Sequence, residues 1–447
     1  MNDYNSGTHH HGTRQGEYIT HHNHPVSIES VHGSRILDSR GYPTVRVSLE
    51  LEDGRTVTGD APAGASTGAH EARELRDGGT AFGGRDVTRA LHLIDTEIAE
   101  LLVGRSWAAI GQIDAALAEL DGTTGYSRLG ANSVVATSIA ASRAFAHAAE
   151  LPLWRWIADV AGTTPRMPVP HFNVLNGGAH AANALDFQEF MIAPVAATSM
   201  ADAVRIGADV YHALASLVQE RFGSAGLGDE GGFAPSIAAP EDALDLLVTA
   251  IRSAGYDADV DGVAIALDPA ANEFHLGDGF YRMLEDSLDR DGLVDYYRNL
   301  VDTYPIRSIE DGFAEDDHDG FHRMQAALGD RIQIVGDDLY VTDPQRIRDG
   351  GERQLSNAAL IKPNQIGTVS QTLGAIATAS SLNMGSMISH RSGETTDTFI
   401  ADLVVGTGTG QIKYGAPARG ERVAKYNRLT EIETTAPTLP FGLLPQH

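Results

Sequence analysis

The stretch GVAIALD, residues 262–268, is a short apolar run that ends in a carboxylate. Five later runs have the same form, because each is apolar and leads directly into a charged or polar residue. They are PIRSIED with Glu310, IQIVGDD with Asp337, AALIK with Lys362, SMISHR with His390 and GQIK with Lys413. Short apolar runs bounded in this way predict buried strands.

The spacing of these runs predicts how the strands are connected. From Asp268 to Lys413, the residues that end the runs lie 42, 27, 25, 28 and 23 positions apart. Each interval accommodates one strand, one helix and their loops, which is the unit of a parallel α/β fold. Six units fit a closed barrel better than an open nucleotide-binding sheet, because no GxGxxG motif follows the first strand. The sequence therefore predicts an α/β fold with a C-terminal (β/α)8-type barrel.

The part of the chain before the barrel has a different pattern. TVRVSLELEDGRTVTGDAP, residues 44–62, alternates apolar and polar residues around Asp53 and Gly54, which predicts a β-hairpin. The glycine-rich PAGASTG loop and helical stretches follow, up to a proline-containing boundary at AGTTPRMPVP. We therefore expect a disordered His-rich tail at 1–26, a smaller N-terminal α+β domain at 27–165 and a catalytic barrel at 166–447.

Composition excludes several classes of function. The formal net charge of −27 opposes binding to nucleic acid or to an anionic membrane surface. The absence of cysteine rules out a disulfide, a thiol nucleophile and a thiolate metal site. No apolar run is long enough to span a membrane, and we find no core of a signal peptide at the N-terminus. These features lead us to expect a cytoplasmic protein.

The carboxylates at the strand ends predict a metal site. Strand ends of a barrel converge on one face, where the active sites of this fold lie. Asp268, Glu310 and Asp337 would repel one another there and raise each other's pKa unless a cation lay among them. Oxygen ligands without cysteine favour Mg²⁺ over zinc. The alternative is a structural cluster of carboxylates neutralised by arginines.

Lysine is rare in this chain, which makes its positions informative. Only three of the 33 basic residues are lysines, and two of them, Lys362 and Lys413, end predicted strands. Lysine can lose its proton and act as a base, whereas arginine effectively cannot. Lys362 is therefore a candidate base, and Lys413 is a candidate for binding an anion. The alternative is that both only neutralise the nearby carboxylates.

Two further motifs carry candidate pocket residues. SHRSGET, residues 389–395, offers His390, Arg391 and Ser392 as partners for a phosphate or carboxylate. GLGDEGGF places Glu230 among glycines, where the backbone can bend and aim this side chain inward. Either motif alone would also suit an ordinary solvated loop.

With these motifs in view, the sequence from about residue 28 to 432 resembles the enolase family. The matching stretches are DSRGYPTV, GASTGAHEARELRDG, LGANS, NVLNGGAHA, DFQEFMIAP, GDEGGFAP, IEDGFAEDD, VGDDLYVT, KPNQIG, SHRSGET and GQIKYGAPARGERVAKYN. The resemblance implies a small N-terminal α+β domain on a (β/α)8 barrel, and a homodimer. It also implies a phosphorylated small-molecule substrate.

The resemblance also assigns roles to individual residues. It implies that Lys362 removes the C2 proton and that Glu230, with Glu189 beside it, assists loss of the C3 hydroxyl. The implied Mg²⁺ ligands are Asp268, Glu310, Asp337 and, from a flexible loop at 64–68 that reaches a second ion, Ser66. The implied substrate contacts are His180, Gln188, His390, Arg391, Ser392 and Lys413.

Four positions depart from the family's pattern and bear on the substrate: Tyr42, Ala63, His318 and Tyr414. We expect Tyr414 to point away from the pocket, because side chains alternate along a strand and Lys413 points in. The leading hypothesis is reversible dehydration of 2-phospho-D-glycerate to phosphoenolpyruvate, as in glycolysis. One alternative is the same dehydration of a related substrate, such as 2-phosphonoformylglycerate in phosphonate synthesis. Another is a non-catalytic binding protein, which would not need the complete set of carboxylates and Lys362.

Overall fold

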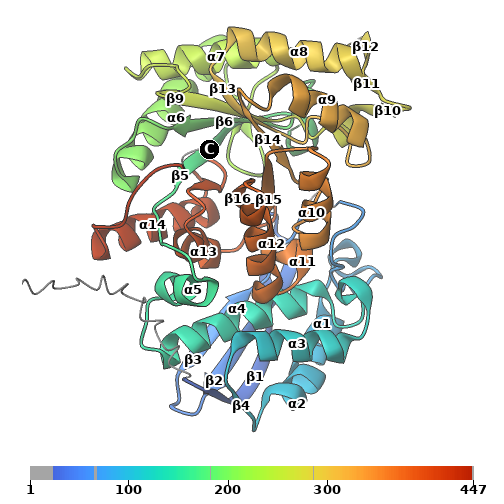
Figure 1. The fold of residues 1–447 in the computed structure, drawn as a ribbon, viewed down its shortest axis with the longest axis vertical. Coiled ribbons are helices and arrows are strands. Elements are labelled where there is room, and N and C mark those ends of the chain that lie inside the picture. Colours follow the sequence, from blue (N-terminus) through green and yellow to red (C-terminus); the bar gives the residue numbers. More distant parts are fainter. Residues whose placement is uncertain (1–23, 65–67, 182, 285, 445–447) are drawn as a thin grey trace, which may run out of the picture.

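The computed structural model describes residues 24–64, 68–181, 183–284 and 286–444. A smaller α+β part, blue to cyan in Figure 1, lies below a closed barrel of eight strands. The predicted fold class is confirmed. The first strand begins at Val26, one residue before the expected start of the N-terminal domain. Residues 1–23 of the expected tail lie outside the described residues.

The N-terminal part contains a four-stranded antiparallel sheet in the order β3-β2-β1-β4. The predicted hairpin is confirmed, because β2 pairs with β3 around Gly54, whose φ of 80° favours glycine. Alternate residues of β2 are fully buried, in agreement with the alternation of the sequence. The strands are β1 (Val26–Leu37), β2 (Pro43–Leu51), β3 (Thr56–Asp60) and β4 (Ser106–Trp107).

Helices cover one face of this sheet. The alanine-rich α4 is buried on nearly all sides, since it packs against β2 and β3 and also against α11 and α12 of the barrel. Gly59 allows this close approach, because a Cβ there would lie 2.3 Å from the carbonyl oxygen of Ala136. The helices of this part are η1 (Ala81–Gly84), α1 (Thr88–Leu93), η2 (Ile94–Ile98), α2 (Ala99–Leu102), α3 (Ile110–Asp121), η3 (Thr124–Tyr126), α4 (Ala131–Ala148) and α5 (Leu153–Ala161).

The barrel closes through pairing of its last strand with its first. All six predicted runs are strands, and each is parallel to the next of the six around the barrel. The second strand, β6, differs from a regular (β/α)8 barrel because it is antiparallel to both β5 and β9. The strands are β5 (Val169–Asn176), β6 (Glu189–Pro194), β9 (Val263–Asp268), β13 (Ile306–Glu310), β14 (Gln333–Gly336), β15 (Ala358–Ile361), β16 (Gly385–Ser389) and β17 (Gln411–Lys413).

The reversed direction of β6 has a local cause. The connection from β5 to β6 contains only the 3-10 turn η4 (Gly178–His180). A parallel pair needs a long crossover, usually a helix, so a connection without one returns the chain antiparallel. As a result, the first residue of β6 lies beside the last residue of β9, at the end of the barrel where the other strands finish.

Helices surround the barrel, and several begin at side-chain caps. Ser199, Asp289, Asp317, Asp343 and Thr368 each accept a hydrogen bond from a backbone N–H of the first turn that follows. The helices are α6 (Met200–Phe222), α7 (Pro240–Ser253), η5 (Ala271–Phe274), α8 (Arg290–Thr303), α9 (His318–Leu328), α10 (Pro344–Glu352), α11 (Pro363–Ile366), α12 (Val369–Ser381), α13 (Phe399–Thr407) and α14 (Gly420–Thr435).

Short strands complete the fold. A hairpin of β7 (Gly226–Leu227) and β8 (Phe233–Ala234) extends the barrel sheet at β5. A separate three-stranded sheet consists of β10 (His275–Gly277), β11 (Phe280–Met283) and β12 (Asp286–Asp289). Among the residues that the structure describes, no helix is both long enough and apolar enough to cross a membrane.

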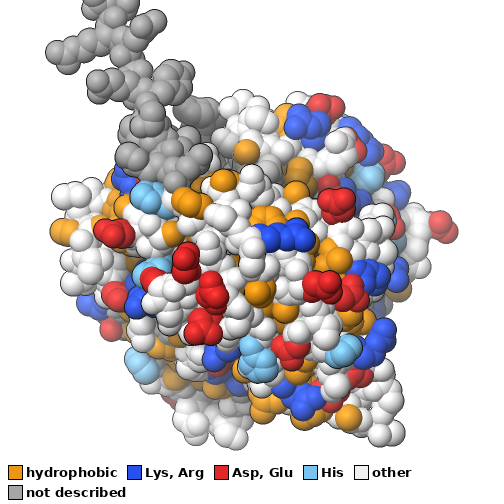
Figure 2. All heavy atoms as spheres, turned by 90° about the horizontal axis from the view of Figure 1, so that it is seen from below, with side chains coloured by type: hydrophobic (Ala, Val, Ile, Leu, Met, Phe, Trp, Pro, Cys, Tyr) orange, Lys and Arg blue, Asp and Glu red, His pale blue; other side chains and the backbone are white. Residues whose placement is uncertain are grey.

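The N-terminal part contacts the barrel close to the strand ends. Ala63 forms an antiparallel bridge with Gly393, and the N–H of Ala72 donates to the carbonyl of Gln365 at 2.8 Å. Arg143 of α4 donates to both carboxylate oxygens of Asp397 at 2.6 and 2.7 Å. Figure 2 views the molecule from the side of the N-terminal part, where acidic and basic side chains are interspersed. The large negative net charge is therefore not gathered on this face.

Candidate active site

Lys413, at the end of β17, joins carboxylates from three other strands. Its Nζ lies 2.8 Å from Asp268, 2.9 Å from Glu310 and 3.2 Å from Glu189. All four side chains are buried. Burial acts to lower the pKa of Lys413, but the surrounding carboxylates outweigh it and hold this pKa well above its ordinary value. Lys413 is therefore a fixed positive charge in the barrel mouth.

Lys362, directly after β15, contacts Asp337. Burial acts to lower the pKa of Lys362, but the Asp337 carboxylate outweighs it and raises this pKa. The lysine in turn outweighs burial at Asp337 and lowers the pKa of that carboxyl. Gln365 donates to the other oxygen of Asp337 at 2.9 Å. In this arrangement Lys362 and Asp337 form an ion pair whose geometry Gln365 supports.

The carboxylates at the ends of β9, β13 and β14 have the chemistry of a site for a hard divalent cation. Burial raises the pKa of Glu310 well above its ordinary value, and the charges of Asp268 and Asp337 raise it further. Such mutual repulsion is relieved by a cation among the three groups. Their donor atoms are all oxygens, which suits Mg²⁺. The residues therefore fit the expected ion. Ser66 lies outside the described residues.

A neighbouring carboxylate organises the backbone of β14's end. Asp311 accepts hydrogen bonds from the N–H groups of Asp337 and Asp338 at 2.9 and 2.8 Å. One carboxylate oxygen of each of these three residues lies within 4.8 Å of the others. Burial, helped by the charge of Asp337, raises the pKa of Asp338 to about 7. Asp311 thus fixes the direction in which Asp337 leaves its strand.

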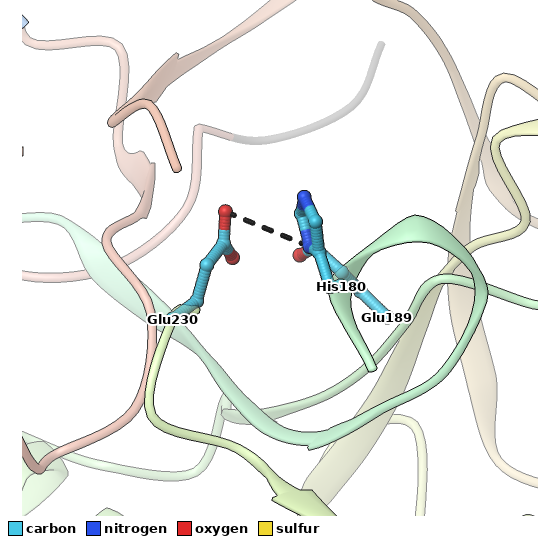
Figure 3. Close-up of side chains that lie close together, drawn as sticks. All are labelled: His180, Glu189 and Glu230. Carbon is cyan, nitrogen blue, oxygen red and sulfur yellow. Dashed lines mark ion pairs between the residues drawn. The ribbon is translucent and has the colours of Figure 1, made fainter. Parts of the chain in front are cut away.

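A second cluster contains His180, Glu189 and Glu230 (Figure 3). One ligand atom of each lies within 4.8 Å of the others, and His180 Nδ1 lies 3.7 Å from Glu189 and 3.9 Å from Glu230. Glu230 comes from the turn between β7 and β8, where Gly231 has a φ of 89°. The backbone bend expected at this glycine-rich turn is confirmed, and the Glu230 side chain is buried.

The surroundings shift the pKa values of the two glutamates of this cluster in opposite directions. Burial raises the pKa of Glu189 well above its ordinary value, and the charge of Glu230 adds to this effect. Burial also acts on Glu230, but His390 and His180 outweigh it and hold the pKa of Glu230 well below its usual range. Burial lowers the pKa of His390 to about 3, so this ring is neutral. Of the two carboxyls, Glu189 is therefore the one whose surroundings favour the protonated form.

The predicted anion-binding residues follow β16 on the same end of the barrel. His390 Nε2 lies 3.1 Å from Glu230 Oε2, and both side chains are buried. Arg391 donates through both terminal nitrogens to Glu71, at 2.8 and 3.1 Å. Ser392 is also buried beside them. Polar atoms of His180 (Nδ1), Gln188 (Oε1) and His390 (Nε2) lack a hydrogen-bond partner among the described residues.

The order of the strands places the two reactive clusters opposite each other. Around the closed barrel, β6 and β15 are four strands apart in either direction. Glu189 is the first residue of β6, and Lys362 directly follows β15. One arc between them carries the carboxylates of β9, β13 and β14, and the other carries His390 and Lys413 of β16 and β17.

Sequence reasoning missed several residues that hold this site together. Glu71 lies against Arg391, Asn173 donates to Glu230 at 2.9 Å, and Gln365 bonds to Asp337. Arg422 of α14 is fully buried and contacts the ring of His390. All four lie inside the stretches that resemble the enolase family, so the motifs contained a signal that residue chemistry alone did not resolve.

The four departures from the family pattern lie at the periphery of these clusters. The Tyr414 hydroxyl contacts the carbonyl of Ile400, and its ring packs 6.1 Å from that of Tyr426, so the expected outward direction is confirmed. Tyr42 lies under the guanidinium of Arg85 at 4.3 Å. His318 begins α9 and contacts Arg353, whereas Ala63 pairs with Gly393 through its backbone only.

A closed barrel with carboxylates and lysines at one end, joined to a small α+β part, defines a barrel enzyme with a polar site at its strand ends. Two family models match the chain, Enolase, N-terminal domain, at residues 28–157, and Enolase, C-terminal TIM barrel domain, at residues 164–438. The chain therefore belongs to the enolase family. Membership makes it a lyase of the enolase superfamily.

Proposed function

We propose that the protein reversibly dehydrates 2-phospho-D-glycerate to phosphoenolpyruvate. The observation that carries this proposal is the placement of Lys362 and the Glu189–Glu230 pair on opposite sides of the barrel mouth. A base on one side and an acid on the other suit removal of a proton and loss of a hydroxide from opposite faces of one substrate. The pairing of a lysine base with Mg²⁺ is a pattern already established for the enolase superfamily.

In the first step, the neutral form of Lys362 takes the proton from C2 through Nζ. A cation held by Asp337 would offset the carboxylate charge that keeps Lys362 protonated in this structure and so favour the neutral amine. The electrons of the C2–H bond then move into the adjacent carboxylate, which gains a second negative charge. Lys413 is held positive by its carboxylate neighbours and would lie beside this charge. Asp268, Glu310 and Asp337 would hold Mg²⁺, which when bound stabilises negative charge on the substrate carboxylate.

In the second step, the C3–O bond breaks while the glutamate pair supplies a proton to the leaving oxygen, which departs as water. Hydroxide is a poor leaving group, so this proton is needed. Burial favours the protonated form of Glu189, and His180 lies beside both carboxyls. In our proposal Glu230 delivers the proton and Glu189 is its immediate source.

The phosphoryl group would be bound on the β16 side by Arg391 and Ser392, and His390, whose two ring nitrogens face Arg422 and Glu230, would lie beside it. Arginine binds phosphate oxygens through two parallel N–H groups, which suits Arg391 for this role. Gln188 and His180 contribute unpartnered polar atoms on the β6 side. Closed contact with the N-terminal part around Ala63 and Glu71 would limit access of water to this end of the site.

The altered positions support the ordinary substrate over a modified one. Tyr414 and His318 direct their polar atoms to Ile400 and Arg353, and not toward the reactive clusters. Ala63 approaches the loop of residues 389–395 through its backbone, which any residue provides. Tyr42 packs under the guanidinium of Arg85. A related substrate such as 2-phosphonoformylglycerate would require a change in the residues that face it, and these four positions do not supply one.

The test is direct. The purified protein is mixed with 2-phosphoglycerate and Mg²⁺, and the absorbance of the enol product is followed. We expect turnover that depends on protein concentration. A protein that turns over a phosphonate analogue but leaves 2-phosphoglycerate unchanged would refute this assignment, and one that turns over neither would favour a non-catalytic role.

A further inference from the structure

Arg422 is a fully buried arginine of α14 whose side chain contacts the residues that follow β16. Its terminal nitrogens donate to the carbonyl oxygens of Arg391 and Ser392, each at 2.6 Å. The same side chain contacts Nδ1 of His390. The two carbonyl oxygens could accept hydrogen bonds from any suitably placed donor. The contact with His390 is different, because it restricts where the imidazole can carry its proton.

The restriction follows from the chemistry of the two groups. Arginine has N–H donors and no acceptor, so the imidazole nitrogen that it contacts must offer a lone pair. His390 is neutral, and a neutral imidazole carries one proton on one of its nitrogens. Because Nδ1 faces Arg422, the proton resides on Nε2, the nitrogen that lies 3.1 Å from Oε2 of Glu230. His390 can therefore approach Glu230 only as a donor.

This arrangement distinguishes the two oxygens of Glu230. Oε2 accepts a hydrogen bond from the side-chain amide of Asn173 at 2.9 Å, and Nε2 of His390 lies 3.1 Å from the same oxygen, although the two are not aligned as a hydrogen bond in this structure. A carboxyl oxygen has two acceptor sites, and these two donors lie beside them. A proton on Oε2 would be directed at the hydrogen of one of these two donors. Oε1 has no such neighbours and instead lies 3.9 Å from His180, on the side of Glu189.

We propose that Arg422 is a positioning residue that holds His390 in the Nε2–H tautomer, so that the proton passed to Glu230 is carried by Oε1. This inference rests on the proposed function for its catalytic meaning, because it specifies which oxygen delivers the proton to the leaving group. Arg422 itself touches no substrate. It acts through His390, and the fixed ring acts through Glu230.

The tautomer is measured without substrate. Neutron diffraction from deuterium-exchanged crystals of the unmodified protein should show deuterium on Nε2 of His390 and none on Nδ1. Deuterium on Nδ1 would overturn the inference. Nitrogen-15 NMR of histidine-labelled protein reports the same property in solution, with the His390→Gln variant identifying the signal.

Arg422→Met and Lys425→Met form a matched pair of variants for this measurement. Lys425 is equally buried on α14 and binds the same loop, through Glu394 at 2.7 Å and the carbonyl of Thr395 at 2.6 Å. Lys425 makes no hydrogen bond to His390 among the described residues. The Lys425→Met variant therefore measures only the effect of loosening the loop. We expect a mixture of His390 tautomers in Arg422→Met and a single tautomer in Lys425→Met. The same single tautomer in both variants would contradict the assignment.

Activity then tests the catalytic consequence. Outer-shell partners that orient metal-ligating histidines contribute about 10- to 100-fold, and we expect dehydration by Arg422→Met to fall by a factor of the same order. Exchange of the C2 proton should persist, because Lys362 acts from the other side. In a His390→Gln background the same substitution should cost much less, since the glutamine amide donates without a choice of tautomer. Equal losses in both backgrounds would refute the positioning role, whereas an unmodified protein inactive on 2-phosphoglycerate would refute only the proposed function.

Discussion

Arg391 of the barrel is bound through both terminal nitrogens by Glu71 of the N-terminal part, at 2.8 and 3.1 Å, and both side chains are buried. The residue proposed to bind the phosphoryl group is therefore held in place by the other domain. Asn364 accepts a further hydrogen bond from Arg391 at 3.2 Å. The contact between Glu71 and Arg391 therefore both joins the two parts and positions the proposed anion-binding residue.

Glu71→Gln should destabilise the protein by about 3 kcal/mol, because it leaves the buried charge of Arg391 without its partner. The measurement is the free energy of unfolding in denaturant. Glu74→Gln is the matched control, since Glu74 lies in the same segment and pairs with Arg76 at 2.6 Å in a partly exposed position. Its loss should cost less than about 1 kcal/mol. Equal effects would show that the Glu71 pair has no special role in docking.

Lys362→Arg should abolish exchange of the C2 proton of 2-phosphoglycerate with solvent, because arginine keeps the charge but cannot act as a base. The loss should be about 10² to 10⁴-fold, the usual contribution of a positioned base. Proton NMR of the substrate in deuterated water measures the exchange. An unchanged melting temperature would serve as the control for folding. Exchange at the original rate would exclude Lys362 as the base.

Glu189→Gln and Glu230→Gln should separate the two halves of the reaction. Each removes the proton carrier opposite Lys362, so dehydration should fall by at least about 100-fold. Exchange at C2 should continue, because the base lies four strands away across the barrel. Both rates are measured on the same sample by NMR and by absorbance of the product. Loss of exchange together with dehydration would mean that the glutamates bind the substrate and do not serve as the acid.

Mg²⁺ should stabilise the protein even without substrate, because an ion that binds only the folded state shifts the unfolding equilibrium. The melting temperature should rise when Mg²⁺ is added to chelator-treated protein, and turnover should return with it. Asp337→Asn should reduce the rise, since this residue is one of three proposed ligands. A melting temperature and an activity that ignore chelator would show that the carboxylates hold no metal.

Much of this fold could be predicted because the residues that end the strands can be recognised in the sequence. Apolar runs that stop at a charged residue locate β9, β13, β14, β15, β16 and β17 and the side chains at their ends. The direction of β6 could not be predicted in this way. After Glu189, the strand EFMIAP is apolar, and such a run contains no sign of its orientation. Glu189 reaches the site only because its strand is reversed, which depends on the short connection from β5.

Buried polar partners could not be predicted either. Arg422 is fully buried, although arginine is among the residues most often exposed. Its position becomes favourable only after α14 packs against the loop of Arg391 and Ser392, whose carbonyls it satisfies. This loop precedes Arg422 by about 30 positions, and no local pattern links the two segments. Such contacts follow from tertiary packing and not from the periodicity of the sequence.

Tyr414 offers the sharpest test of the substrate. Its hydroxyl contacts the carbonyl of Ile400, and its ring is fully buried against Tyr426, so it does not face the clusters at the barrel mouth. Tyr414→Phe should therefore retain full activity and lose about 1 kcal/mol of stability with the hydrogen bond. Tyr414→Thr should also retain activity, but the cavity left by the ring should cost about 3 kcal/mol.

The decisive comparison is catalytic efficiency on 2-phosphoglycerate for the unmodified protein and for Tyr414→Thr. A competent parent whose efficiency barely changes supports the proposed reaction, because Tyr414 then contributes only to packing behind Lys413. An inactive parent that gains activity with threonine would mean that the phenol limits the substrate site. That result would favour the related substrate, because Tyr414, next to the proposed anion-binding residue Lys413, would then select against 2-phosphoglycerate.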